Sequence, residues 1–159
     1  MLPHHLAIAE CVVAAARHLW PRPWGSRPAV RMLLAIGLQE SALVRRRQHP
    51  AGPARTYWQM EPQTIQAVLA HPVVGPVVTS VLRQLGVVDV WHPDVDPMAA
   101  ATVARGLLRT SPRPLPMAEA EAWEEYTRTW RPGKPAPERW PQNWALAGEL
   151  TASAWREET

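Results

Sequence analysis

The stretch that decides the fold covers residues 35–64. It begins as Ala35-Ile-Gly-Leu-Gln-Glu-Ser-Ala-Leu, continues as a basic, polar loop, and closes with Tyr57-Trp-Gln-Met-Glu-Pro-Gln-Thr. The residues from Met32 to Ile36 are apolar on nearly all sides of a helix, which indicates a helix in the core. Glu40 closes this run, and partial desolvation at the end of a buried helix raises a carboxyl pKa. The stretch therefore predicts one protonated carboxyl group at the edge of a cleft, where it could act as a general acid.

Helical spacing of apolar residues, punctuated by proline, dominates the rest of the chain. Ser26 and Asp96 are predicted N-caps, each followed by a proline in the first turn. Gly37 lowers helix propensity inside its helix, so we expect another helix to approach closely there. The segment 76–85 is rich in valine, which leaves a strand open as an alternative. We expect an all-α fold of six to seven helices in a single domain spanning 1–159, with helices at about 3–20, 28–41, 63–71, 76–85, 97–109, 117–130 and 140–155.

Composition narrows the classes of function. The 159 residues contain nine tryptophans and no phenylalanine, so tryptophan must supply much of the aromatic core, and some indoles could stack on a ligand. Cys11 is the one cysteine, which excludes an internal disulfide framework. The six histidines show no metal-binding spacing and no phosphate-binding or nucleophile motif is present, so we expect no metal and no cofactor.

The charge balance is modestly basic, with a formal net charge of +3. The densest cationic cluster is 45–47, three consecutive arginines in the polar loop. It could attract nucleic acid, anionic lipid or an acidic cell-wall polymer, and charge alone does not choose between them. Because the basic residues are not spread along one helix face, a helical nucleic-acid binder ranks low, and nucleic acid is not an expected partner.

The N-terminal apolar run, 6–16, is about as long as the core of a signal peptide. His4, His5 and Glu10 stand where such a leader would have a clear cationic segment, and the run continues as an ordinary helix. We therefore expect neither a cleaved signal nor a transmembrane segment, since no stretch reaches the roughly 18 apolar residues needed to span a bilayer.

Two parts of the central stretch together resemble a known family. Glu40-Ser41 closes an apolar helix, and Gln59, Pro62 and Thr64 follow in the pattern Gln-x-x-Pro-x-Thr, nineteen residues after the glutamate. This is similar to the signature of the soluble lytic transglycosylases, which belong to the lysozyme-like superfamily. The basic loop, the aromatic-Trp-Gln run and the late Trp-Arg-Pro-Gly-Lys-Pro segment are similar to small peptidoglycan-degrading proteins of tailed bacteriophages.

The resemblance implies a lysozyme-like catalytic domain that cleaves the β-1,4 bond between N-acetylmuramic acid and N-acetylglucosamine. One protonated carboxyl, Glu40, would protonate the leaving oxygen. As a carboxylate it would then accept the proton of the muramoyl C6 hydroxyl, which closes a 1,6-anhydro ring without a second catalytic carboxylate. The implied partners are peptidoglycan strands and, in a virion, other virion proteins; whether such a protein acts in the virion or at host lysis stays open. The residues implied to bind substrate are Ser41, Tyr57, Trp58, Gln59 and Tyr126.

The sequence departs from the family pattern at several positions. Pro53 and Thr56 stand where the family has glycine, so the backbone at Thr56 is expected to turn differently, and Thr127 follows Tyr126 where the family has asparagine. These departures motivate a non-catalytic alternative, a phage structural or wall-binding protein with the same fold. A hydrolytic muramidase also stays open, because an ordinary glycosidase needs a paired carboxylate about 5–9.5 Å away and Glu61 is the nearest candidate.

Each of these side chains also has a purely structural alternative. Glu40 could be a solvated helix-end residue, or a salt-bridge partner of the arginine cluster at 45–47. Ser41 could simply end the helix, and Gln59 could cap a turn. Trp58 and Tyr126 could belong to the core, because Tyr126 shares a helix face with two further tryptophans, Trp123 and Trp130.

Overall fold

The structure, a computed structural model, describes residues 1–46, 48, 51–89 and 95–156. Within these ranges the chain is all-helical, and its only strand-like pairing is one isolated antiparallel bridge. Two short 3-10 helices, η1 (Arg22–Trp24) and η2 (Pro137–Arg139), join longer elements. The seven α-helices are α1 (Pro3–His18), α2 (Arg27–Ser41), α3 (Pro62–Ala70), α4 (Val74–Gln84), α5 (Pro97–Arg109), α6 (Glu119–Trp130) and α7 (Trp140–Ala154).

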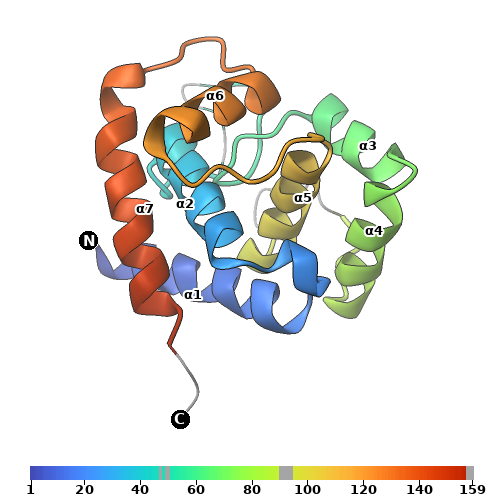
Figure 1. Cartoon of the computed structure of the whole chain (residues 1–159). Helices are drawn as coiled ribbons and strands as arrows, with labels where there is room; N and C mark the ends of the chain where they lie inside the picture. Colours follow the sequence, from blue (N-terminus) through green and yellow to red (C-terminus); the bar gives the residue numbers. More distant parts are fainter. Residues whose placement is uncertain (47, 49–50, 90–94, 157–159) are drawn as a thin grey trace.

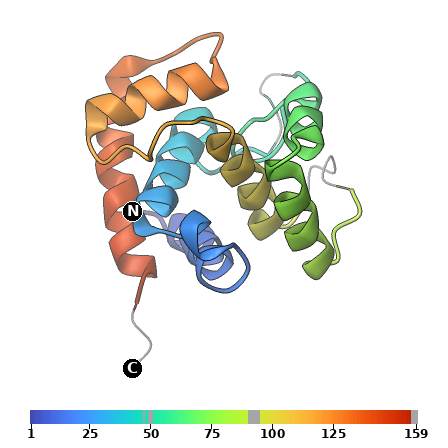
Figure 2. The ribbon, with the colours of Figure 1, turned by 45° about the vertical axis from the view of Figure 1, so that its right-hand side comes forward.

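Helix α2 is the centre of the arrangement. Figure 1 shows α7 packed along one side of it, α6 lying over its C-terminal end, and α1 crossing below. Helices α3 and α4 form a pair that packs on α5, away from α7, as the turned view in Figure 2 also shows. Eleven of the fifteen residues of α2 are buried, which confirms the prediction of a core helix. This position fixes the end of α2, and so Glu40, at the junction between the α3 side and the α6 side.

The helix boundaries follow the local chemistry predicted from the sequence. The Ser26 hydroxyl accepts a hydrogen bond from the Ala29 amide at 3.3 Å, and the Asp96 carboxylate accepts one from the Met98 amide at 2.7 Å. Both residues are therefore N-caps, as expected. The valine-rich segment 76–85 is helical and belongs to α4, so the strand alternative is wrong: Val78, Val81 and Leu82 lie on one buried face at helical spacing.

No single helix among the described residues is long and apolar enough to cross a membrane. Helices α3 and α4 together pass the same test on length and composition, but they are bent by 105° at the break between them.

The close approach at Gly37 has a different cause from the one expected. A Cβ built on Gly37 would lie 2.5 Å from Cδ2 of Leu43 and 3.4 Å from Nε1 of Trp58. Both neighbours come from the segment that follows α2, so the expectation of a neighbouring helix is wrong. The chain reverses at Ala42 and Leu43, which have positive φ values of 56° and 54°, and this reversal folds Leu43 back onto the helix.

Replacing Gly37 with alanine tests this contact. We expect Gly37→Ala to lower the free energy of unfolding by about 1 kcal/mol, because overpacking a buried site costs more than the gain in helix propensity returns. Urea denaturation followed by circular dichroism measures the change. Gly133→Ala is the matched control, since a Cβ there meets nothing within 4 Å. A Gly37→Ala protein more stable than the wild type would contradict the contact.

Candidate functional site

A cleft of about 1250 Å³ opens beside the C-terminal end of α2. One wall comes from the turn before α3 and from α3 itself. The other comes from the α5–α6 linker, the end of α6 and the segment that leads through η2 to α7. Glu40 and its neighbour Gln39 lie between the two walls. The lining residues used below are Glu40, Arg45, Gln59, Glu61, Arg113, Tyr126, Arg128, Trp130, Arg131, Lys134 and Arg139.

Glu40 is held in a defined position by one strong hydrogen bond. The Tyr126 hydroxyl donates to Oε1 of Glu40 at 2.8 Å. Burial raises the pKa of Glu40 above its ordinary value, while the Tyr126 hydrogen bond and the positive charge of Arg139 lower it, and burial is the largest of the three effects. Because Tyr126 donates to Oε1, Oε2 is the oxygen that carries the proton when Glu40 is protonated. The arrangement is that of an oriented carboxyl group biased toward its protonated form.

The ring of Tyr126 is fixed by an aromatic cluster. It lies parallel to Trp140 of α7 at 5.3 Å between centroids, and it contacts Trp123 at 5.5 Å and Trp130 at 6.5 Å within α6. The i, i+3, i+7 face predicted for α6 is therefore confirmed. Tyr126 is only 2% exposed, and burial followed by the nearby Glu40 raises the pKa of its hydroxyl. It thus acts as a neutral donor to Glu40 while its ring belongs to the core.

The turn before α3 places Gln59 on the cleft. Arg55 and Met60 form the isolated bridge through two hydrogen bonds of 2.9 Å, and the four residues between them make the turn. Thr56 has φ 68°, a left-handed conformation that glycine adopts most easily. The Gln59 side chain donates to the Thr56 carbonyl at 2.8 Å, which leaves its amide oxygen to accept from a ligand.

Three residues predicted to bind substrate do not line the cleft. Ser41 is buried and donates to the carbonyls of Gly37 at 3.1 Å and Tyr57 at 2.6 Å. Trp58 is fully buried, and its indole donates to the Leu33 carbonyl at 2.8 Å. Tyr57 is 8% exposed and its hydroxyl accepts from Arg46. These residues tie the turn to α2, so their predicted contact with substrate is corrected to a supporting position, whereas Glu40, Gln59 and Tyr126 do meet at the cleft.

Glu61 also lines the cleft, as the exposed N-cap residue of α3. Its side chain makes no capping hydrogen bond. No group of three or more histidine, cysteine, aspartate or glutamate side chains lies together in a metal-binding arrangement in the described part of the chain. Of the basic loop residues, Arg45 lines the cleft, and Arg47 lies outside the described residues.

Several cleft residues were missed from the sequence. Trp130, and not Trp58, is the tryptophan that lines the cleft, and its indole donates to the Trp58 carbonyl at 2.9 Å. The Gln39 amide donates to the Ala136 carbonyl and accepts from Asn143, so it fixes the start of η2 beside Glu40. Arg139 comes from η2. No spacing in the sequence relates Arg139 to the site, because it lies 99 positions after Glu40. Gln39 directly precedes Glu40, but its contacts with Ala136 and Asn143 join residues 97 and 104 positions apart.

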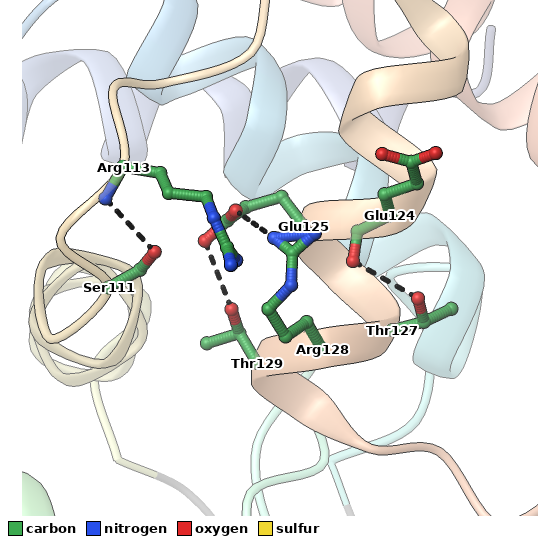
Figure 3. Close-up of polar contacts among 7 residues, drawn as sticks. All are labelled: Ser111, Arg113, Glu124, Glu125, Thr127, Arg128 and Thr129. Atoms are coloured by element: carbon green, nitrogen blue, oxygen red, sulfur yellow. Dashed lines mark hydrogen bonds and ion pairs between the residues drawn. The ribbon is translucent and has the colours of Figure 1, made fainter.

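Figure 3 shows the polar contacts behind the α6 wall. The Glu125 carboxylate accepts from Arg128 at 3.0 Å and from Thr129 at 3.3 Å. Arg113 extends from the α5–α6 linker toward α6. Glu125 is buried and orients the Arg128 side chain through this ion pair.

Removing the Tyr126 hydroxyl should change the pH profile of any reaction that uses Glu40. The Tyr126 hydrogen bond lowers the pKa of Glu40, so Tyr126→Phe raises that pKa further and extends the protonated form to higher pH. We expect the alkaline limb of the pH–rate profile to move to higher pH. The maximal rate should fall by about 10- to 100-fold, since a hydrogen bond to a charged group is worth about 1.5–3 kcal/mol.

The control is Tyr57→Phe, which removes a hydroxyl that contacts Arg46 and not Glu40. Tyr57→Phe should leave the alkaline limb of the pH–rate profile at the same pH as in the wild type. An alkaline limb that stays fixed or moves to lower pH in Tyr126→Phe would contradict the assignment.

Comparison of the chain with protein-family models, with curated proteins and with solved structures finds no match.

Proposed function

We propose that this chain is a peptidoglycan-cleaving enzyme with a lysozyme-like fold, of the lytic transglycosylase type, in which Glu40 is the single acid/base. The observation that carries the proposal is the oriented, partly desolvated carboxyl of Glu40 in a cleft of about 1250 Å³, with Tyr126 donating to one of its oxygens. The motif around Glu40, Gln59 and Thr64 supplies the reaction class by resemblance.

The proposed reaction begins with Glu40 protonated. Oε2 gives its proton to the oxygen that leaves the muramoyl C1, and the glycosidic bond breaks. The resulting carboxylate then accepts the proton of the C6 hydroxyl as that oxygen bonds to C1, which closes the 1,6-anhydro ring and regenerates the acid. During the carboxylate stage the Tyr126 hydrogen bond and the charge of Arg139 stabilise the negative charge, so the two effects that lower the pKa assist the second step.

The cleft chemistry suits a glycan bearing N-acetyl groups. Gln59 offers an amide oxygen, Trp130 offers part of an indole surface, and Thr64 lines the cleft at the start of α3. Amide and hydroxyl groups pair with the N-acetyl and hydroxyl groups of sugars, and an indole face packs on a sugar ring. The cleft is thus equipped to hold a strand on either side of Glu40.

A hydrolytic muramidase is the second candidate, and the position of Glu61 on the same cleft favours it. In that mechanism Glu61 would act as the second carboxylate. Glu61→Gln separates the two: it should leave wall cleavage nearly unchanged in a transglycosylase, and it should abolish cleavage in a two-carboxylate hydrolase. The third candidate is a non-catalytic wall-binding protein. Such a protein would bind purified wall without releasing fragments.

The direct test is a zymogram with purified peptidoglycan, coupled to measurement of soluble fragments. We expect a clearing band at the position of the wild-type protein and release of soluble muropeptides. Binding of folded protein to the wall with no clearing and no release would overturn the enzymatic proposal in favour of the wall-binding alternative.

A further inference from the structure

The two walls of the cleft differ in charge. The linker, α6 and η2 wall contributes five cationic side chains: Arg113, Arg128, Arg131, Lys134 and Arg139. The α3 wall contributes Gln59, Gln63 and Thr64, with Glu61 as its carboxylate and Arg45 as a cation at its edge. Among the described residues that line the cleft, the positive charge is therefore concentrated on the wall formed by the linker, α6 and η2.

Most of this charge is not neutralised within the protein. Arg128 is paired with Glu125 at 3.0 Å. No ion pair within 4 Å joins Arg131, Lys134 or Arg139 to a carboxylate of the described residues. Exposed cations arranged along one wall create a field that attracts an anion and orients it. A ligand in the cleft should therefore present its negative groups to this wall.

From this asymmetry we infer that the cleft selects a glycan that carries carboxylates along one edge. The basic wall binds these carboxylates, and the α3 wall binds the opposite edge of the strand, which carries uncharged N-acetyl and hydroxyl groups. The inference rests on the proposed function, and it specifies the substrate as an anionic glycan strand in preference to a neutral one such as chitin. The carboxylates have two sources: the free lactyl group of a strand without peptides, or the peptides of an intact strand.

Nucleic acid fits the cleft less well. A duplex carries phosphates on both edges, whereas the cations of the cleft are confined mainly to one wall and the other carries Glu61. Single strands bind on rows of exposed aromatic rings. Within the described part of the chain, the tyrosine and tryptophan residues that line this cleft are Tyr126, which is 2% exposed, and Trp130. Carboxylates along one edge of a sugar strand match the arrangement better.

The test measures binding, separately from cleavage, in a Glu40→Gln background. The charge variant is Arg131→Gln with Lys134→Gln, and its matched control is Arg22→Gln with Arg83→Gln, two exposed arginines outside the cleft. The probes are intact peptidoglycan, peptidoglycan stripped of its peptides, insoluble chitin and DNA. Each is measured at low salt and at about 1 M salt, where charges are screened beyond about 3 Å.

We expect the charge variant to bind at least one of the two anionic glycans about three- to tenfold more weakly at low salt. High salt should remove the difference, and chitin binding and the control variant should be unaffected. If the charge variant loses affinity only for stripped strands, the basic wall binds the lactyl carboxylate. If it loses affinity only for intact strands, the basic wall binds the carboxylates of the peptides. The inference would be overturned if the charge variant lost as much affinity for chitin as for the anionic glycans, or if the control variant lost as much affinity as the charge variant. It would also be overturned if the charge variant bound both anionic glycans as well as the wild type did, or if DNA bound more tightly than the glycans and its binding was weakened in the charge variant.

The outcome is separable from that of the proposed function. If the wild type releases no fragments but the binding pattern holds, the cleavage proposal fails and the ligand assignment stands. If the wild type cleaves wall while the pattern is missing, only the ligand assignment fails.

Discussion

Glu40→Gln should lower the rate of wall cleavage by about 10²–10⁴-fold, the usual contribution of a positioned general acid. The substituted amide has nearly the same shape, and its oxygen still accepts from Tyr126, so the site keeps its geometry. The amide has no acidic proton to give to the leaving oxygen. Release of soluble muropeptides by the purified protein measures the loss, and Glu10→Gln, an exposed residue of α1, is the matched control.

The same substitution has a predictable effect on stability. Burial raises the folded-state pKa of Glu40, so its contribution to stability is fully present below the ordinary carboxyl pKa and is lost as pH rises through the raised value. At neutral pH the glutamine variant should therefore be as stable as the wild type or more stable, and its thermal midpoint should not be lower than that of the wild type. A Glu40→Gln protein that does not fold would contradict this stability prediction. A folded Glu40→Gln protein that still cleaves wall would contradict the assignment of Glu40 as the acid.

Trp58→Ala should have the largest effect on stability, with a loss of about 3–5 kcal/mol in the free energy of unfolding. The indole is fully buried, it packs against Gly37 and Tyr57, and it bonds to the Leu33 carbonyl. Such a loss is a large part of the 5–15 kcal/mol that stabilises a typical domain. Urea denaturation of the purified variant, followed by tryptophan fluorescence and circular dichroism, measures it.

Two comparisons sharpen this prediction. Trp58→Phe keeps most of the packing and should cost less than Trp58→Ala. Trp155→Ala, at a partly buried indole contacted by Arg17 and Arg27, should also cost less than Trp58→Ala. If Trp58→Ala kept full stability but raised the KM for wall substrate, Trp58 would be a sugar platform and the core position would be wrong.

The helices could be predicted because their determinants are local. Apolar spacing, the caps at Ser26 and Asp96, and the prolines in the first turns of several helices all act within a few residues. The reversal after α2 was not predictable in the same way, because Ala42 and Leu43 adopt positive φ without a glycine. The sequence therefore predicted that another helix contacts Gly37, whereas Leu43 and Trp58, from the segment after α2, make this contact.

The candidate site was predictable only where its residues are close in sequence. Glu40 and Gln59 follow from one motif, but the Tyr126 contact with Glu40 joins residues 86 positions apart. The pattern also cannot tell a tryptophan that faces the core from one that faces a cleft, since both sit on apolar faces. For this reason Trp58 was predicted to bind substrate although it is buried, and Trp130 was not singled out although it lines the cleft. The charge difference between the two walls depends on residues that only the tertiary structure brings together.

The most direct measurement is mass spectrometry of the fragments that the purified wild-type protein releases from purified peptidoglycan, with Glu40→Gln in parallel. The account predicts 1,6-anhydromuramoyl ends from the wild type and no fragments from the variant. Reducing ends would contradict the one-carboxylate mechanism, and the absence of any glycan fragment from the folded wild type would contradict the assignment of Glu40 as an acid.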